Sequence, residues 1–109
     1  MEQDDKTRIL CILDAIDEVQ SYLGNASYPD FIDNSMMRVA TVKQLEIIGN
    51  TCGNISTKFK KTRRDFSWQE VEALKSGLIH EYFGINYEKV WKTATHNLKN
   101  YKQEFEKMC

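Results

Sequence analysis

The stretch ILCILDAIDEVQSYLG, residues 9–24, repeats apolar side chains at intervals of three and four residues. That spacing places them on one face of an α-helix, because the helix turns once every 3.6 residues. Asp4 or Asp5 can cap the beginning of this helix, and Gly24 can end it. The pattern therefore predicts an amphipathic helix that packs its apolar face against the rest of a helical domain.

The next region predicts a turn and then a long helix. Residues 25–30 surround the only proline of the chain, so we expect a turn-rich connector there. Residues 33–59 have apolar side chains at helical spacing in their later half. Gly49 and Gly53 each follow an apolar position, so we expect either a close approach of a neighbouring backbone or a bend in the helix. Residues 58–64 form a basic connector.

The second half of the chain predicts two further helices. Ser67 and Glu70 have the spacing of a capping box. In this motif the side chain of each residue accepts a hydrogen bond from the backbone N–H of the other. This third helix should extend to about His80 or Tyr82, where a Phe-Gly-Ile-Asn segment interrupts it. Asn86 can then cap a fourth helix that has a single apolar stripe. No segment alternates convincingly between apolar and polar residues, as a half-buried strand would.

These patterns predict an all-α domain over residues 1–109, an antiparallel four-helix bundle whose second helix can be kinked. Fifteen basic and sixteen acidic residues give a net charge of -1, so the overall charge does not indicate nucleic-acid binding. The longest apolar run, residues 9–13, is too short to span a membrane. Since the three cysteines lack paired or metal-ligand spacing, we expect reduced thiols, no metal, no cofactor and a cytoplasmic protein.

The segment LKSGLIHEYFG, residues 74–84, contains the side chains best suited to chemistry. On a continuous helix Ser76 and His80 would share a face, whereas Lys75 and His80 would lie about 140° apart. Lys75 and His80 could then reach one atom only through a long side chain, an unwound helix end or a second subunit. Spacing alone therefore makes His80 a structural or helix-capping histidine more readily than a catalytic one. His96 lies among polar residues and is expected at the surface.

Several segments resemble the HepT-like branch of the HEPN superfamily along nearly the whole chain. They are Phe31, LEIIG at 45–49, Trp68, HEYFGIN at 80–86 and VW at 90–91. The resemblance implies a HEPN-like bundle and a ribonuclease toxin that pairs with a minimal nucleotidyltransferase. It also implies a homodimer in which the paired third helices form a cleft for RNA.

The family's ribonuclease motif is an arginine and an asparagine, then three residues, the histidine, one residue and a tyrosine. By resemblance, His80 is the general acid or base, while Lys75 and Ser76 occupy the positions of the arginine and the asparagine. The family is thought to cleave RNA without metal, through attack of the ribose 2′-hydroxyl on the adjacent phosphate. Histidine can carry the proton at neutral pH. Lysine lacks the two-pronged geometry of arginine, so we expect weakened or absent cleavage.

Two functional hypotheses follow from the resemblance. In the first, the chain is a metal-independent ribonuclease toxin, and its nucleotidyltransferase partner silences it by attaching AMP to Tyr82. In the second, it is a catalytically weakened or inactive HEPN module that binds a nucleotidyltransferase and a nucleotide. His80 and Tyr82 favour the first, whereas Lys75 and Ser76 favour the second. Asn50 also departs from the family, which usually has a glutamate after LEIIG.

A basic run lies between the second and third predicted helices. Its simplest interpretation is a solvated connector, and the alternative is a track that guides RNA phosphates to His80. Under that alternative the RNA-binding residues are Lys60, Lys61, Arg63 and Arg64. Trp68 and Trp91 are expected in the core or at an interface, because they lie at helical spacing from other apolar positions.

Overall fold

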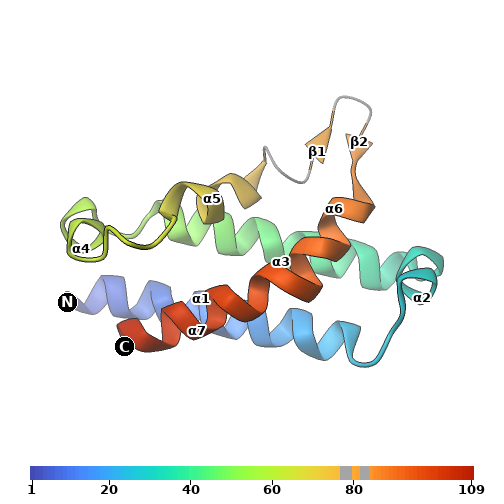
Figure 1. Cartoon of the computed structure of the whole chain (residues 1–109), viewed down its shortest axis with the longest axis horizontal. Helices are drawn as coiled ribbons and strands as arrows, with labels where there is room; N and C mark the ends of the chain where they lie inside the picture. Colours follow the sequence, from blue (N-terminus) through green and yellow to red (C-terminus); the bar gives the residue numbers. More distant parts are fainter. Residues whose placement is uncertain (77–79, 82–83) are drawn as a thin grey trace.

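The computed structural model describes residues 1–76, 80–81 and 84–109, and of residues 80 and 81 only the backbone. The molecule measures 42 × 30 × 20 Å along its principal axes. Two long helices, α1 (Gln3–Leu23) and α3 (Ser35–Gly53), lie side by side and run in opposite directions (Figure 1). A third rod crosses them and brings the C-terminus back near the N-terminus (Figure 1). It consists of α6 (Tyr87–Lys92), the π-helical turn η2 (Thr93–Asn97) and α7 (Leu98–Met108).

Short elements connect these rods. They are α2 (Tyr28–Asp33), α4 (Thr57–Thr62), α5 (Trp68–Glu72), the 3₁₀ turn η1 (Ala73–Lys75) and the strands β1 (His80–Glu81) and β2 (Gly84–Ile85). The two strands pair antiparallel and stand out from the helices in Figure 1. Apart from this ribbon, the described residues form helices and connectors, which confirms the all-α prediction. In the described part of the chain, no helix is both long enough and apolar enough to cross a membrane.

The first helix has the predicted face and end but not the predicted beginning. Its apolar stripe, Ile9 to Val19, is buried against the core. Gly24 has φ +49° and donates its N–H to the Gln20 carbonyl, which ends the helix as expected. Neither Asp4 nor Asp5 is the cap, because the helix begins after Glu2. Asp5 lies inside the helix and binds Ser56 instead.

The predicted helix over residues 33–59 is interrupted twice. The connector around the proline is itself helical, because Ser27 and Asp30 form a capping box at the start of α2. At the other end, α3 ends at Gly53 and a new helix, α4, begins after Ser56. The Ser56 hydroxyl accepts the Phe59 N–H at 3.1 Å. Instead of the expected bend, the predicted helix is therefore broken completely between α3 and α4.

Among the described glycines, Gly49 has the closest approach of a neighbouring backbone. A Cβ atom at this position would lie 2.3 Å from the backbone nitrogen of Lys75 and 2.9 Å from the carbonyl carbon of Leu74. The predicted close approach is thus confirmed here, with η1 as the neighbour. At Gly53 a Cβ atom would meet only the Glu72 carboxylate oxygen, at an ordinary 3.7 Å.

The third predicted helix is shorter than expected. Ser67 makes no capping bond, and the Glu70 carboxylate accepts the Tyr101 hydroxyl instead, so the predicted capping box is wrong. The helix tightens into η1 and ends at Lys75, and the backbone of Ser76 leaves the helical region at φ -155°. Serine and glycine at 76–77 are weak helix formers. His80 lies in β1, where it pairs with Ile85, so a helix reaching His80 is also wrong.

The fourth predicted helix begins where expected. The Asn86 side chain accepts the Lys89 N–H at 3.1 Å and caps α6. The helical rod then loosens into the π-helical turn η2, where the Thr95 hydroxyl donates to the Trp91 carbonyl at 2.7 Å. Val90, Leu98 and Phe105 are fully buried along the rod, so the apolar stripe packs as the sequence indicates.

We predict that Gly49→Ala lowers the free energy of unfolding by about 1–3 kcal/mol, because the new methyl group would overlap the η1 backbone. Gly53→Ala is the matched control on the same helix, and alanine's helix preference should leave it neutral or slightly more stable. Urea denaturation of both variants measures the difference. Equal stabilities would mean that η1 can move away from α3 without cost.

Candidate functional site

The candidate catalytic segment begins at the end of η1. Lys75 and Ser76 are both exposed, and they directly follow Leu74, whose side chain is buried in the core. The backbone here rests against Gly49 of α3. A buried leucine on one side and a backbone contact on the other therefore fix the base from which these two side chains leave the bundle.

The other end of the segment is fixed by α6. β2 leads through Asn86 into that helix, and Val90 anchors it in the core. β1 pairs with β2 in the register His80 with Ile85 and Glu81 with Gly84. The structure thus places the backbone of His80 in a two-stranded ribbon between two anchored elements.

The helical geometry expected for the catalytic residues does not exist. Ser76 and His80 do not share a helical face, because the helix ends before Ser76 and His80 is in a strand. The side chain of His80 and the whole of Tyr82 lie outside the described residues. Convergence of Lys75, Ser76 and His80 on one phosphate therefore stays a prediction.

The basic run divides into two kinds of side chain. The Lys60 ammonium lies 2.8 Å from the Glu72 carboxylate and 5.8 Å from the centre of the Trp68 ring. Arg63 lies 3.8 Å from a carboxylate oxygen of Glu104. These two side chains thus hold α4 and the following turn against neighbouring helices.

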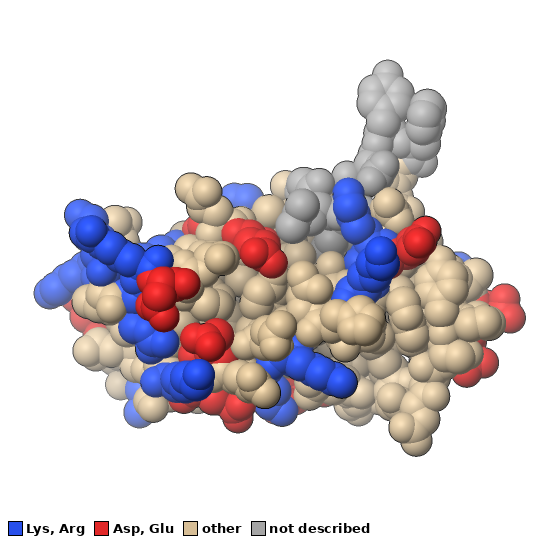
Figure 2. All heavy atoms as spheres, viewed as in Figure 1, with Lys and Arg blue, Asp and Glu red and all other residues tan. Residues whose placement is uncertain are grey.

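Lys61 and Arg64, the other two residues assigned to the phosphate track, are exposed to solvent. Basic side chains gather at the α4 end of the face shown in Figure 2. Figure 1 places α4 and the β1–β2 ribbon towards opposite ends of the long axis. A phosphate track from one to the other would therefore run along the long axis of the molecule.

A second basic group, of which the sequence singled out only Lys75, lies on the elements that flank the ribbon. The elements that flank the ribbon contribute the exposed Lys75 at the end of η1 and the exposed Lys92 at the end of α6. Among the residues that the structure describes, no three His, Cys, Asp or Glu side chains form a metal-binding group.

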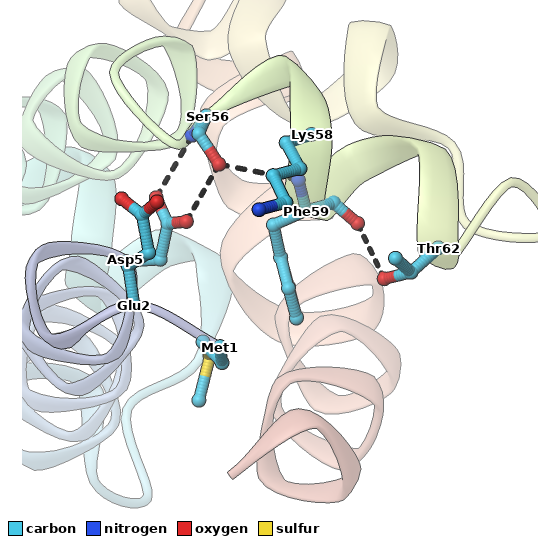
Figure 3. A pocket seen from close by; sticks show the side chains of 7 residues that line it. All are labelled: Met1, Glu2, Asp5, Ser56, Lys58, Phe59 and Thr62. Atoms are coloured by element: carbon cyan, nitrogen blue, oxygen red, sulfur yellow. Dashed lines mark hydrogen bonds between the residues drawn. The ribbon is translucent and has the colours of Figure 1, made fainter.

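A pocket of about 270 Å³ lies between the N-terminus and α4 (Figure 3). The Asp5 side chain, 2% exposed, accepts the Ser56 N–H at 2.8 Å and the Ser56 hydroxyl at 2.6 Å. Burial alone would raise the pKa of Asp5, but the two bonds from Ser56 and the nearby Arg8 charge lower it overall. Asp5 therefore fastens the beginning of α4, the helix that carries the first part of the basic run, to α1. A partner 51 residues away leaves no local signal in the sequence.

Comparison with known proteins identifies the family. The chain matches the family described as "Ribonuclease HepT-like" over residues 12–108. It is 30% identical to the "Probable ribonuclease HepT" of Thermococcus cleftensis, over 99% of this chain and 98% of the relative. A "Putative RNase" of Methanocaldococcus jannaschii is 32% identical, over 98% of this chain and 88% of the relative. A second from that organism is 33% identical over 96% of both chains. No solved structure matches.

We predict that Asp5→Asn lowers the free energy of unfolding at pH 7 by about 1–3 kcal/mol, because a charged acceptor for Ser56 is lost. The folded pKa lies below the ordinary carboxyl value of about 3.9. The stabilisation is therefore present above that value and is lost as the pH falls through the folded pKa.

Urea denaturation at pH 7 and pH 3 should show the gap between wild type and Asp5→Asn narrowing at the lower pH. Asp4→Asn, an exposed neighbour, should change stability little at either pH. A gap of the same size at both pH values would contradict the role given to the Asp5 charge.

Proposed function

This chain belongs to the HepT-like ribonuclease family, and we propose that it is a metal-independent RNA endonuclease, the toxin of a toxin–antitoxin pair. The observation that carries the proposal is the family match over residues 12–108, which includes the whole segment from Lys75 to Tyr82. The anchoring of that segment at Leu74 and at Val90 supports it, because a catalytic segment needs a rigid base.

In the proposed reaction the RNA supplies its own nucleophile. The ribose 2′-hydroxyl loses its proton and attacks the adjacent phosphorus, and the 5′-oxygen of the next nucleotide leaves with a proton. His80 is proposed to move one of these protons, since an imidazole changes charge near neutral pH. Lys75 stabilises the charge that develops on the phosphate oxygens, and Ser76 is a supporting hydrogen-bond donor.

The alternative proposal is a HEPN module that no longer cleaves RNA but still binds a nucleotidyltransferase and a nucleotide. The observation in its favour is the pair Lys75 and Ser76, where the family motif has arginine and asparagine. An ammonium group can supply charge to a phosphate, but it cannot make the planar two-pronged contact of a guanidinium.

Regulation, assembly and location are part of the same proposal. A minimal nucleotidyltransferase is the proposed antitoxin, Tyr82 the proposed AMP acceptor and the cytoplasm the proposed location. A homodimer is supported by apolar side chains on the outer surface of α3, where Met36 is 81% and Val39 63% exposed. Burial of these side chains against another protein surface would remove apolar surface from water, which is favourable.

We predict that wild-type RNA cleavage in EDTA is slow and that Lys75→Arg combined with Ser76→Asn accelerates it. Losing one well-placed donor to a developing oxyanion typically costs on the order of 10²–10³ in rate. The charge of Lys75 should recover part of that loss, so the double change should raise turnover more than RNA affinity. His80→Ala should abolish cleavage.

Single-turnover rates and RNA affinities, measured on the same preparations, separate these effects. Brisk wild-type cleavage that the double change leaves unaltered would make Lys75 an adequate catalytic cation. A folded chain that cleaves RNA in neither form would favour the binding-module alternative.

We predict that the nucleotidyltransferase partner attaches AMP to Tyr82. The adduct would add negative charge to the proposed catalytic segment and repel an RNA phosphate from it. Intact-mass analysis after incubation with the partner and ATP should show the added mass in wild type and its loss in Tyr82→Phe. Persistence of the adduct in Tyr82→Phe would place the acceptor elsewhere.

A further inference from the structure

We propose that the aromatic surface formed by Tyr28, Tyr87 and Trp91, with Arg38 at its edge, stacks against bases of single-stranded RNA beside the ribbon. We call it the aromatic surface below. The inference rests on the proposed ribonuclease function and assigns it a substrate-binding site. The sequence alone favoured a core or interface role for Trp91, because helical spacing does not reveal which ring edges reach solvent.

The aromatic surface is a continuous series of ring contacts. The fully buried Phe31 forms its floor, 5.3 Å from the Trp91 ring and 6.3 Å from the Tyr87 ring between centroids. The Tyr28 ring meets Trp91 edge-on at 5.8 Å. Tyr87 and Trp91 are half-buried, and Tyr28 is 36% exposed. Rings held this way lose little freedom when a base stacks on them.

Arg38 extends the aromatic surface with a cation. Its guanidinium lies 5.1 Å from the centre of the Tyr87 ring and also donates to the Ile32 carbonyl. The guanidinium is therefore held over an aromatic ring. Arginine planes and aromatic rings are the groups on which proteins stack unpaired bases.

The second aromatic cluster of the molecule provides a contrast. Trp68 is only 8% exposed, and its indole N–H donates to the Arg63 carbonyl at 3.0 Å. Its neighbours Phe66 and Phe105 are buried, and the Tyr101 hydroxyl donates to the Glu70 carboxylate. That cluster is internal, and its polar groups are satisfied within the domain. The cluster around Trp91 instead presents several partly exposed rings together.

The position of the aromatic surface suits a substrate of the proposed catalytic segment. Paired residues in an antiparallel ribbon lie about 4.5–5.5 Å apart between Cα atoms, and consecutive Cα atoms are about 3.8 Å apart. Since His80 pairs with Ile85, the Cα atom of Tyr87 lies within roughly 13 Å of that of His80. Trp91 is one turn farther along α6, about 6 Å.

The combination of rings and cations favours RNA over a protein as the occupant. Lys92, at the end of α6, and Lys75, at the end of η1, are both exposed, and Arg38 adds a third cation. The same surface also has carboxylates, because Asp30 and Asp33 on α2 and Glu88 on α6 are exposed. Aromatic rings combined with cations match the bases and phosphates of a single strand. The exposed apolar residues Met36 and Val39 lack any such combination and suit a protein contact better.

The experiment titrates the full chain with a 2′-O-methyl RNA single strand, which lacks the attacking hydroxyl and cannot be cleaved. Because the chain has two tryptophans and Trp68 is buried, we expect stacking to quench the fluorescence of Trp91. The quench should be present in wild type and absent in Trp91→Phe, which retains Trp68 alone.

Affinity is the second readout. Trp91→Leu keeps an apolar side chain against Phe31 but removes the indole, and it should weaken RNA binding roughly ten- to hundredfold. Trp91→Phe should retain most of the affinity. Leu10→Ala, an exposed apolar residue on α1, is the matched control and should bind as wild type does. Circular dichroism confirms that each variant is folded.

The outcomes separate this inference from the proposed function. RNA that is bound or cleaved by wild type without quenching Trp91 overturns the aromatic surface and leaves the ribonuclease proposal standing. A chain that neither binds nor cleaves RNA overturns both. If Trp91→Leu keeps wild-type RNA affinity but changes the sedimenting mass, the aromatic surface contacts protein and the inference is wrong.

Discussion

The contact between Gly49 and the backbone of Lys75 is the constraint on which the candidate site depends. A Cβ atom on α3 at this position would lie 2.3 Å from the Lys75 nitrogen, so η1 reaches its place only because residue 49 is glycine. Leu74 enters the core there and Ser76 leaves the helix immediately afterwards. The position of η1 thus determines where the side chains of Lys75 and Ser76 are exposed to solvent and where the chain leaves the bundle.

A second anchor completes the arrangement. Asn86 caps α6, Val90 is buried, and the chain between η1 and α6 returns through two paired strands. Both ends of the candidate catalytic segment are therefore held by the bundle, while β1 and β2 stand out from it (Figure 1). The proposed aromatic surface lies close to the ribbon along the chain, because α6 begins two residues after β2.

Helical periodicity predicted the elements that bury a long apolar face. Residues 9–23 and the rod ending at Met108 could be predicted because their apolar faces and end signals agree. It did not predict the breaks, because they depend on distant partners. The sequence predicts Asp5 as a helix cap, but its carboxylate binds Ser56. It predicts Glu70 as part of a capping box, but its carboxylate accepts the Tyr101 hydroxyl. Likewise, His80 lies in a two-stranded ribbon and not in the predicted helix. Strands of two residues are too short to show an alternating apolar pattern in the sequence.

The site was predicted less by pattern than by resemblance. The angles between Lys75, Ser76 and His80 were derived for a continuous helix. Because the helix ends at Lys75 and His80 lies in a strand, those angles do not apply. The prediction of close backbone approach at Gly49 survives, because it depends on the absence of a side chain and not on a period. The pairing of Lys60 with Glu72 and of Arg63 with Glu104 could not be predicted. A run of basic residues does not reveal which of its side chains lie beside carboxylates in the fold.

We propose that the segment held by Gly49 cleaves RNA without metal, through attack of the substrate's own 2′-hydroxyl. Mass spectrometry of the RNA products formed in EDTA tests it most directly. The account predicts fragments that end in a 2′,3′-cyclic phosphate, and an intact substrate wherever the single 2′-hydroxyl at the cleavage position is replaced by hydrogen. Fragments with a 3′-hydroxyl and a 5′-phosphate, or cleavage of the 2′-deoxy position, would contradict it.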